Sequence, residues 1–225
     1  MKTILITGAN SGIGFECAKQ FSKNHKVIAV SRNIDKLNLV ESSNLHSVKC
    51  DLTNYTELVT VFKNVVSGNP KIDVLINNAG VAYYGDFNQI GHENNSRQIQ
   101  TNITALTNVI EQILPTMQLN LSGTIINISS LSDRHPRPNN VVYAATKAYV
   151  KSLSESLRAA NGQYNIRITN IAPAMIDTPI LKELKKQSSE LIAVDEFVNI
   201  IDFIINQPKH ICIRDIVVAP TKYPN

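Results

Sequence analysis

Tyr143 and Lys147 form the pair of side chains whose types and spacing most directly suggest chemistry. They are four residues apart, so on a helix they would share one face. A free tyrosine has a pKa of about 10 and is a poor proton donor or acceptor at neutral pH. An ammonium one turn away favours the phenolate and lowers that pKa, which suits acid–base work. An exposed lysine beside a packed tyrosine is the alternative for an isolated pair.

A cluster of glycines near the start of the chain predicts a phosphate-binding turn. Three of the nine glycines, Gly8, Gly12 and Gly14, fall between residues 7 and 14, directly after a β-branched run. One glycine permits a tight turn, a second lets the backbone approach a pyrophosphate, and a third lets helix and strand pack closely. The helix that follows would offer free N–H groups to the phosphates. A glycine turn without a ligand is the alternative.

Strand and helix patterns alternate along the whole chain and must position these residues. Short β-branched runs predict strands at Thr3–Thr7, Lys26–Ser31, His46–Cys50, Ile72–Asn77, Gly123–Ser129, Asn165–Ile171 and Ile213–Ala219. Most lack apolar/polar alternation and are predicted to be buried on both faces. Apolar residues at helical spacing predict helices through Ile99–Met117, Val150–Leu157 and Ile192–Ile205. This alternation predicts an α/β fold, with a parallel sheet covered by helices on both sides.

Composition and charge exclude several classes of protein. The net charge is +4, but Lys and Arg are scattered, which favours a solvated surface over nucleic-acid binding. No apolar run approaches the roughly 20 residues that span a bilayer, and the N-terminal stretch is too short for a secretory signal. Cys17, Cys50 and Cys212 show no metal-ligand spacing and no disulfide framework. We expect a cytoplasmic protein with reduced thiols and without a metal, a membrane or a nucleic-acid partner.

Six motifs, in order along the chain, resemble those of the short-chain dehydrogenase/reductase family. They are the glycine turn at 7–14, the N-N-A-G segment at 77–80, Asn102, Ser130, the Y-x-x-x-K pair, and the segment at 173–178, where Ala174 replaces the usual glycine. The resemblance implies a Rossmann-type, doubly wound sheet of about seven strands in the order 3-2-1-4-5-6-7. It covers nearly the whole chain, so we expect one domain over residues 1–225.

The resemblance implies a catalytic tetrad and a dinucleotide site. Tyr143 would exchange a proton with the substrate oxygen, Ser130 would polarise that oxygen, and Asn102 would hold a water that links Lys147 to solvent. Lys147 would also bind the nicotinamide ribose. The residues expected to bind the cofactor are Gly8, Asn10, Ser11, Gly12, Ile13, Gly14, Ser31, Arg32, Asp51, Leu52, Asn78, Ala79, Gly80, Tyr143, Lys147, Pro173, Ile176 and Thr178.

The end of the second predicted strand indicates which cofactor is preferred. An NAD-specific enzyme usually has Asp or Glu there, to accept from the ribose 2′-hydroxyl. This chain has Ser31 and Arg32, whose hydroxyl and guanidinium would hold a 2′-phosphate. We therefore predict NADP, and a surface arginine without a ligand is the alternative. Asp51-Leu52 matches the family's adenine-binding pair, although Asp51 could equally cap the next helix.

A separate set of residues is expected to meet the substrate. The segment 177–189 corresponds to the family's substrate lid, and candidate pocket residues are Ala82, Tyr83, His135, Met175 and Leu181. Ordinary loop packing is the alternative for each of them. The segment 206–221 resembles a branch of NADP-dependent reductases that act on small 3-hydroxy acids, serine-like alcohols and assorted carbonyls.

These features predict an NADP-dependent alcohol dehydrogenase or carbonyl reductase, which moves hydride between NADP(H) and a small carbonyl or secondary alcohol such as a 3-hydroxy acid. A non-catalytic NADP-binding sensor on the same fold is the alternative, and the complete tetrad favours the enzyme. The helices at 99–119 and 142–160 resemble those through which the family assembles, with Ala105 and Ala145 allowing close approach. We expect a homodimer or homotetramer, and the sequence leaves open which.

Overall fold

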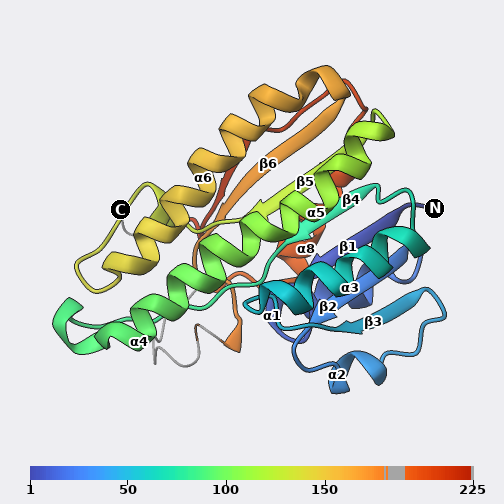
Figure 1. The fold of residues 1–225 in the computed structure, drawn as a ribbon. Helices are drawn as coiled ribbons and strands as arrows, with labels where there is room; N and C mark the ends of the chain where they lie inside the picture. The colour runs from blue at the N-terminus through green and yellow to red at the C-terminus, as the bar shows by residue number, and fades with distance from the viewer. Residues whose placement is uncertain (180, 182–190, 224–225) are drawn as a thin grey trace.

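The described part of the chain forms one parallel sheet with helices on both faces. The structure is a computed structural model that describes residues 1–179, 181 and 191–223. Its seven strands lie in the order β3-β2-β1-β4-β5-β6-β7 (Figure 1). Their bounds are β1 Thr3–Thr7, β2 Lys26–Ser31, β3 Leu45–Lys49, β4 Val74–Asn77, β5 Gly123–Ile128, β6 Ile166–Pro173 and β7 Asp215–Val218. The predicted Rossmann-type sheet and its strand order are confirmed.

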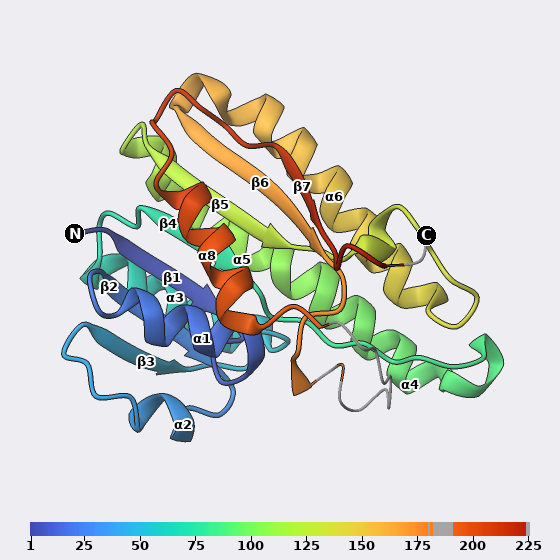
Figure 2. The same cartoon turned by 180° about the vertical axis from the view of Figure 1, so that it is seen from behind.

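The helices form two layers that enclose the sheet. One layer contains α1 (Gly12–Phe21) and α8 (Val194–Ile205), which cross the face turned to the viewer in Figure 2. The other contains α3 (Tyr55–Gly68), α5 (Leu106–Leu119) and α6 (Val141–Asn161), at the front of Figure 1. The shorter or peripheral helices are α2 (Asp35–Asn38), α4 (Phe87–Ile99), the 3₁₀ turns η2 (Leu131–Asp133) and η3 (Gly162–Tyr164), and the π-helix η1 (Gln100–Ala105).

Burial along the strands explains why the sheet could be predicted. Every residue of β4 and β5 is buried, because these strands have neighbours on both sides and helices on both faces. Two-sided burial is predicted for most of the strands, and the exceptions are the edge strands β3 and β7, which are partly exposed. Each of them pairs with a single neighbour, so fewer elements cover it.

The predicted helix at 99–119 is a composite of α4, η1 and α5. Ile99 is exposed and therefore does not belong to the apolar face on which it was expected. Ala105 is buried in the core between the sheet and the outer helices, so it offers no surface for a second chain. Ala145 on α6 is exposed. The π-helical turns of η1 place Asn102 inward, where it is 1% exposed.

Candidate active site

A cavity of about 410 Å³ opens where the carboxyl ends of the central strands meet the following loops. In an open α/β sheet this edge is the usual place for a ligand. Most of the predicted residues line it together: Gly8, Asn10, Ser11, Gly12, Ile13, Ser31, Arg32, Asp51, Leu52, Asn78, Ala79, Gly80, Ser130, Tyr143, Lys147, Pro173, Ile176 and Thr178. Gly14 and Asn102 are not among the lining residues and lie behind the cavity wall.

The glycine turn between β1 and α1 has a backbone that other residues would strain. Gly8 and Gly12 have φ angles of +64° and +51°, in the left-handed region that favours glycine. A Cβ on Gly14 would overlap the carbonyl oxygen of Gly8 and lie 2.5 Å from Nδ2 of Asn78. That amide nitrogen donates to the carbonyl oxygens of Thr7 (3.1 Å) and Gly8 (3.0 Å). Gly14 therefore permits close packing of helix and strand, as predicted.

The polar groups at this turn fit the phosphates of a dinucleotide. Helix α1 begins after Ser11, whose side chain makes no capping hydrogen bond, so the first N–H groups of the helix face the cavity without a side-chain acceptor. Asn10 also lines the cavity, and its Nδ2 is the atom of this side chain that could donate to a phosphate, since Oδ1 can only accept. A helix N-terminus with a glycine-rich approach is a ready anion site. The residues present are thus suited to a pyrophosphate.

The ends of β2 and β3 form the other end of the cavity. Ser31, Arg32 and Asn33 line it there, together with Asp51. The carboxylate of Asp51 accepts from the main-chain N (3.0 Å) and Oγ1 (2.7 Å) of Thr53. Burial acts to raise the pKa of Asp51, but these hydrogen bonds and the nearby guanidiniums hold it below its usual value. The alternative of Asp51 as a helix cap is wrong, since Asn54 caps α3 by accepting from the N–H of Glu57.

Tyr143 and Lys147 lie on the first two turns of α6, and both side chains line the cavity. Nζ of Lys147 donates to the carbonyl oxygen of Ile128 at 2.8 Å and lies 5.7 Å from the centre of the Tyr143 ring. Lys147 is 6% exposed, and burial lowers its pKa to about 8, against the opposing charge of Asp133. The ammonium of Lys147 is thus held by the carbonyl of Ile128 and lies over the ring of Tyr143.

The expectation that Lys147 lowers the pKa of Tyr143 is wrong for this arrangement. Burial raises the pKa of the phenol, and polar interactions with the side chains of Ser130 and Tyr84 offset only part of that effect. A phenolate at this position would lose its hydration. The free-energy cost of that loss exceeds the stabilisation that the neighbouring polar groups give to the phenolate. Tyr143 is therefore held in its protonated form at neutral pH.

Ser130 and Asn102 take different positions around this pair. Ser130 begins the 3₁₀ turn η2, where its Oγ accepts from the N–H of Ser132 at 3.2 Å. The side chain of Asn102 both donates to and accepts from the backbone of Val81, at 2.9 Å each, and donates to Oγ1 of Thr146 at 3.1 Å. Its amide thus fixes the loop after β4 against α6. The structure places Asn102 behind Gly80, beside Lys147.

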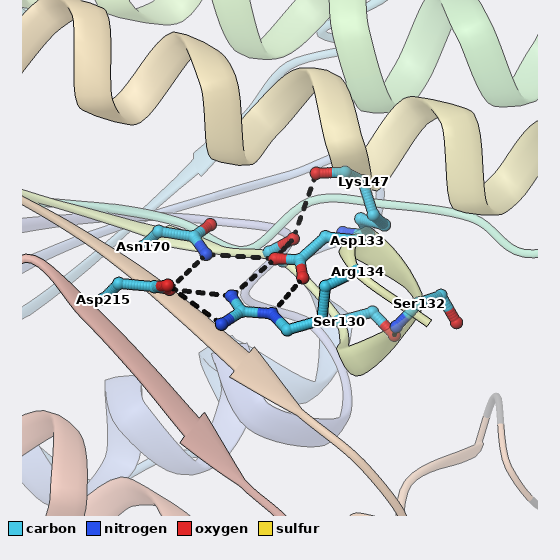
Figure 3. A network of polar contacts seen from close by, with 8 residues as sticks. Ser130, Ser132, Asp133, Arg134, Lys147, Asn170 and Asp215 are labelled. Atoms are coloured by element: carbon cyan, nitrogen blue, oxygen red, sulfur yellow. Dashed lines mark hydrogen bonds and ion pairs between the residues drawn. The ribbon is translucent and has the colours of Figure 1, made fainter. Parts of the chain in front are cut away.

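A partly buried ionic network, which the sequence did not reveal, supports the serine turn (Figure 3). The guanidinium of Arg134 lies between two carboxylates, with Nε 2.6 Å from Asp133 Oδ1 and Nη2 2.8 Å from Asp215 Oδ1. Nδ2 of Asn170 donates to both carboxylates, at 3.0 and 2.9 Å. Ser129 donates to Asp133 at 2.9 Å and to the main-chain oxygen of Lys147 at 3.2 Å. The network thereby ties β6 and β7 to the turn that carries Ser130.

The substrate end of the cavity is only partly as expected. Met175 and Leu181 line the cavity, whereas Ala82, Tyr83 and His135 do not. Tyr83 is turned away because its N–H donates to buried Gln98 and its hydroxyl accepts from Arg97. The residues missed there are Ser132, Tyr84, Arg137, Asn139, Asn140 and Tyr223. Of the proposed lid at 177–189, residues 180 and 182–189 lie outside the described part of the chain.

The segment after β6 accommodates Ala174 in place of glycine. Ala174 does not have a positive φ, and the left-handed residue is its neighbour Met175, at +58°. The ends of the following segment are held together, because Ile192 donates to the oxygen of Met175 at 3.0 Å and its own oxygen accepts from Asp177 at 2.9 Å. A methyl group at position 174 therefore leaves the turn intact.

Comparisons with known proteins agree with the fold and show the family. The sequence profile of the short chain dehydrogenase family matches residues 2–189. Serine 3-dehydrogenase of Rhizobium radiobacter is 32% identical over 233 residues, covering 97% of this chain and 93% of that enzyme. A serine dehydrogenase solved in its closed form with NADP⁺ has a TM-score of 0.88 at 26% identity, covering 99% and 96% of the two chains. A 3-ketoacyl-(acyl-carrier-protein) reductase from Brucella melitensis, solved with NADH, has a TM-score of 0.91 at 25% identity, covering 98% of each chain.

The described residues contain neither a membrane-spanning helix nor a metal-binding cluster. None of their helices combines the length and apolar character needed to cross a bilayer. The same residues contain no group of three or more His, Cys, Asp or Glu side chains placed to hold a metal ion.

Proposed function

The chain belongs to the short-chain dehydrogenase/reductase family, and on that premise we propose that it is an NADP-dependent oxidoreductase which interconverts a small carbonyl compound and the corresponding secondary alcohol. The observation that carries the proposal is the common cavity, which Tyr143, Lys147 and Ser130 share with the glycine turn. A non-catalytic sensor needs only the glycine turn, so the Tyr143–Lys147 pair in the cavity lining favours the enzyme.

The cofactor assignment is supported by both ends of the cavity. The N–H groups at the start of α1 and the amide of Asn10 would bind the pyrophosphate, and Lys147 would bind the nicotinamide ribose. Ser31 and Arg32 would bind a 2′-phosphate, which favours NADP over NAD. The nicotinamide, when bound, supplies or accepts the hydride. Relatives solved with NADP⁺ and with NADH are both known, so the support for NADP comes from these two residues.

Tyr143 would act as the general acid in the direction of reduction. Burial keeps its phenol protonated, so that its proton can be transferred to the substrate oxygen as negative charge develops there, which leaves the phenolate. The hydroxyl of Ser130 would donate a hydrogen bond to the same oxygen. Lys147, whose pKa is lowered to about 8, would return a proton to the phenolate after each turnover. In the direction of oxidation the same groups would work in reverse.

Asn102 would contribute by positioning the loop after β4, and it would not contact the substrate directly. We propose that it holds the loop of Gly80 and Val81 in place, and that its main chain offers the site for the water that links Lys147 to solvent. The side-chain amide already makes three hydrogen bonds to protein groups, which supports a role for the backbone in this relay.

The remaining features complete the proposal. We propose one domain over residues 1–225, a substrate lid at 177–189, a cytoplasmic location, and a homodimer or homotetramer that assembles through the helical segments 99–119 and 142–160, which α5 and α6 mostly form. Exposed Ala145 supports the use of α6, whereas buried Ala105 takes no part. The relatives named serine dehydrogenases support a small hydroxy acid as one candidate substrate.

The test is a comparison of cofactors on a panel of carbonyl compounds. Oxidation of NADPH and of NADH would be followed with aldehydes, ketones, oxo acids and sugars, and kcat/KM compared for each cofactor. We expect at least one carbonyl compound to be reduced, with NADPH preferred by about tenfold or more. A clear preference for NADH would remove the NADP assignment. Tight NADPH binding without turnover of any compound would favour the sensor.

A further inference from the structure

Arg137 brings a fixed cationic group into the substrate end of the cavity. It lies in the loop after η2, between Pro136 and Pro138, and it lines the same cavity as Ser130 and Tyr143. Neither proline carries a backbone N–H, and both restrict φ, so this loop is stiff around the arginine. The family motifs described above do not include this position.

The backbone of Arg137 is connected to Ser130 by a short chain of hydrogen bonds. Its N–H donates to Oδ1 of Asn140 at 2.9 Å, and its carbonyl oxygen accepts from the N–H of Asn140 at 3.1 Å. Nδ2 of Asn140 donates to Oγ of Ser132 at 2.9 Å, and the N–H of Ser132 donates to Oγ of Ser130. Asn140 is 2% exposed. The arginine is therefore held at a set position relative to the serine that would polarise the substrate.

The guanidinium is oriented by Tyr223, which belongs to the segment after β7. Nη2 donates to the Tyr223 hydroxyl at 2.9 Å, and the guanidinium carbon lies 5.4 Å from the centre of that ring. Stacking on one tyrosine fixes the plane of the guanidinium, which is what bidentate binding of a carboxylate requires. The ring thus presents the guanidinium in a defined orientation.

Tyr84 connects this group to the reacting end of the site. Its ring centre lies 5.6 Å from that of Tyr143, and the charge of Arg137 acts on its phenol. The described charged residues that line the cavity are Arg32, Asp51, Arg137 and Lys147. Arg32 and Asp51 belong to the end formed by β2 and β3, so both charged groups at the substrate end are cationic. Among the described lining residues, the charges at this end of the cavity are therefore positive, which suits an anionic group of a ligand.

From this geometry we propose that Arg137 binds a carboxylate of the substrate and selects oxo acids or hydroxy acids over neutral carbonyl compounds. The reacting oxygen would lie between Ser130 and Tyr143, and the carboxylate would extend past the Tyr84 ring to the guanidinium. This inference rests on the proposed oxidoreductase function of the same cavity. It adds the charge class of the substrate, and it names Arg137 as the residue that determines specificity.

The test uses pairs of substrates that differ only in charge. Pyruvate, acetoacetate and levulinate would each be compared with its methyl ester as a substrate for reduction by NADPH, since the three acids place the carboxylate at increasing distance from the carbonyl carbon. We expect the acid of at least one pair to exceed its ester in kcat/KM by about tenfold or more. A charge-assisted bidentate contact supports a preference of that size.

Variants at position 137 show whether the arginine is responsible. R137M should lower kcat/KM for the preferred acid by about 10- to 100-fold and leave the ester within about threefold, while R137K retains part of the preference. R158M, which removes an arginine paired with Glu155 on the outer surface of α6, is the matched control and should change neither substrate. NADPH affinity should stay within about twofold in all three variants, which confirms that they are folded.

The outcomes separate this inference from the proposed function. Equal rates on acid and ester for every pair, or an equal loss on both in R137M, would overturn the role of Arg137 and leave the oxidoreductase intact. If no compound is reduced, the proposed function fails, and binding to the NADP⁺-loaded protein decides the inference by calorimetry. Butyrate should then bind at least tenfold more tightly than butyramide, and R137M should abolish the difference. The absence of any such difference would overturn the carboxylate site as well.

Discussion

The ammonium of Lys147 lies 5.7 Å from the centre of the Tyr143 ring and donates its hydrogen bond to the carbonyl oxygen of Ile128. Burial acts on the two side chains in opposite senses. It raises the pKa of Tyr143 and lowers that of Lys147 to about 8. A protonated phenol and a lysine that releases its proton near neutral pH are matched to proton transfer between substrate and solvent. The burial of each side chain is the main cause of its pKa shift, and the interaction between the two side chains is not.

The lowered pKa of Lys147 predicts a pH-dependent contribution to stability. The folded-state pKa of about 8 lies below the ordinary lysine value of 10.5, so between these values the unfolded chain holds a proton that the folded chain has released. The free energy of unfolding therefore rises with pH across this window, and the rise is absent in K147M. Urea unfolding of both proteins at about pH 7 and pH 10 should show the wild type gaining about 2 kcal/mol relative to K147M. A stability difference between wild type and K147M that stays constant with pH, or that changes in the opposite direction, would contradict the lowered pKa of Lys147.

The close approach at Gly14 predicts a position that tolerates no side chain. A Cβ there would meet the backbone oxygen of Gly8, whereas nothing lies within 4 Å of a Cβ on Gly68 at the end of α3. We expect G14A to destabilise the protein by about 1–3 kcal/mol and to weaken NADPH binding. G68A should leave stability unchanged or raise it by up to about 1 kcal/mol. Urea midpoints measure both, and equal effects of the two variants would show that the packing of Gly14 is not critical.

The network around Asp133 predicts strong coupling between its members. The Asp133 side chain is fully buried, and Arg134 is its principal counter-charge (Figure 3). R134M would leave that carboxylate without its cation, which should cost about 3 kcal/mol of stability. The double variant D133N/R134M removes the uncompensated charge and should recover at least half of the loss. Additive losses in the double-mutant cycle would argue against this coupling.

The sheet and the cofactor end of the site were predictable because the responsible signals are local. The central strands are buried on both faces and therefore appear as continuous β-branched runs. The glycine turn needs positive φ angles at two set positions, and such a requirement is visible in the sequence. Ser31 ends β2, Arg32 follows it directly, and both line the cavity as expected.

The substrate end was less predictable because it depends on contacts between distant segments. Arg137 meets Tyr223 only because the segment after β7 returns to the loop after β5. The pKa of Tyr143 was mispredicted for the same reason, since its burial depends on Tyr84 and other groups from separate loops. The sequence predicts Tyr83 in the substrate pocket, whereas Tyr84 lines the cavity. Which of these two neighbouring side chains faces the cavity depends on the orientation of their loop, and the sequence alone does not give that orientation.

The position of Arg32 predicts a change of cofactor preference on its removal. R32A should lower kcat/KM for NADPH by about 10- to 100-fold and leave that for NADH within about threefold, because only NADPH carries the 2′-phosphate. K36A, in α2 and outside the lining of this cavity, controls for the loss of one positive charge nearby. An equal loss with both cofactors would show that Arg32 acts through structure and not through the phosphate.

The central claim is that Tyr143 transfers the proton in an NADPH-dependent reduction. The most direct measurement is a single turnover, in which protein loaded with NADPH is mixed with the best carbonyl substrate and the loss of NADPH absorbance is followed. In Y143F the ring that packs on Tyr84 is retained and only the hydroxyl is lost. We expect the rate to fall by about 100-fold or more, with NADPH affinity within about twofold of the wild type. A Y143F protein that turns over at the wild-type rate would contradict the account.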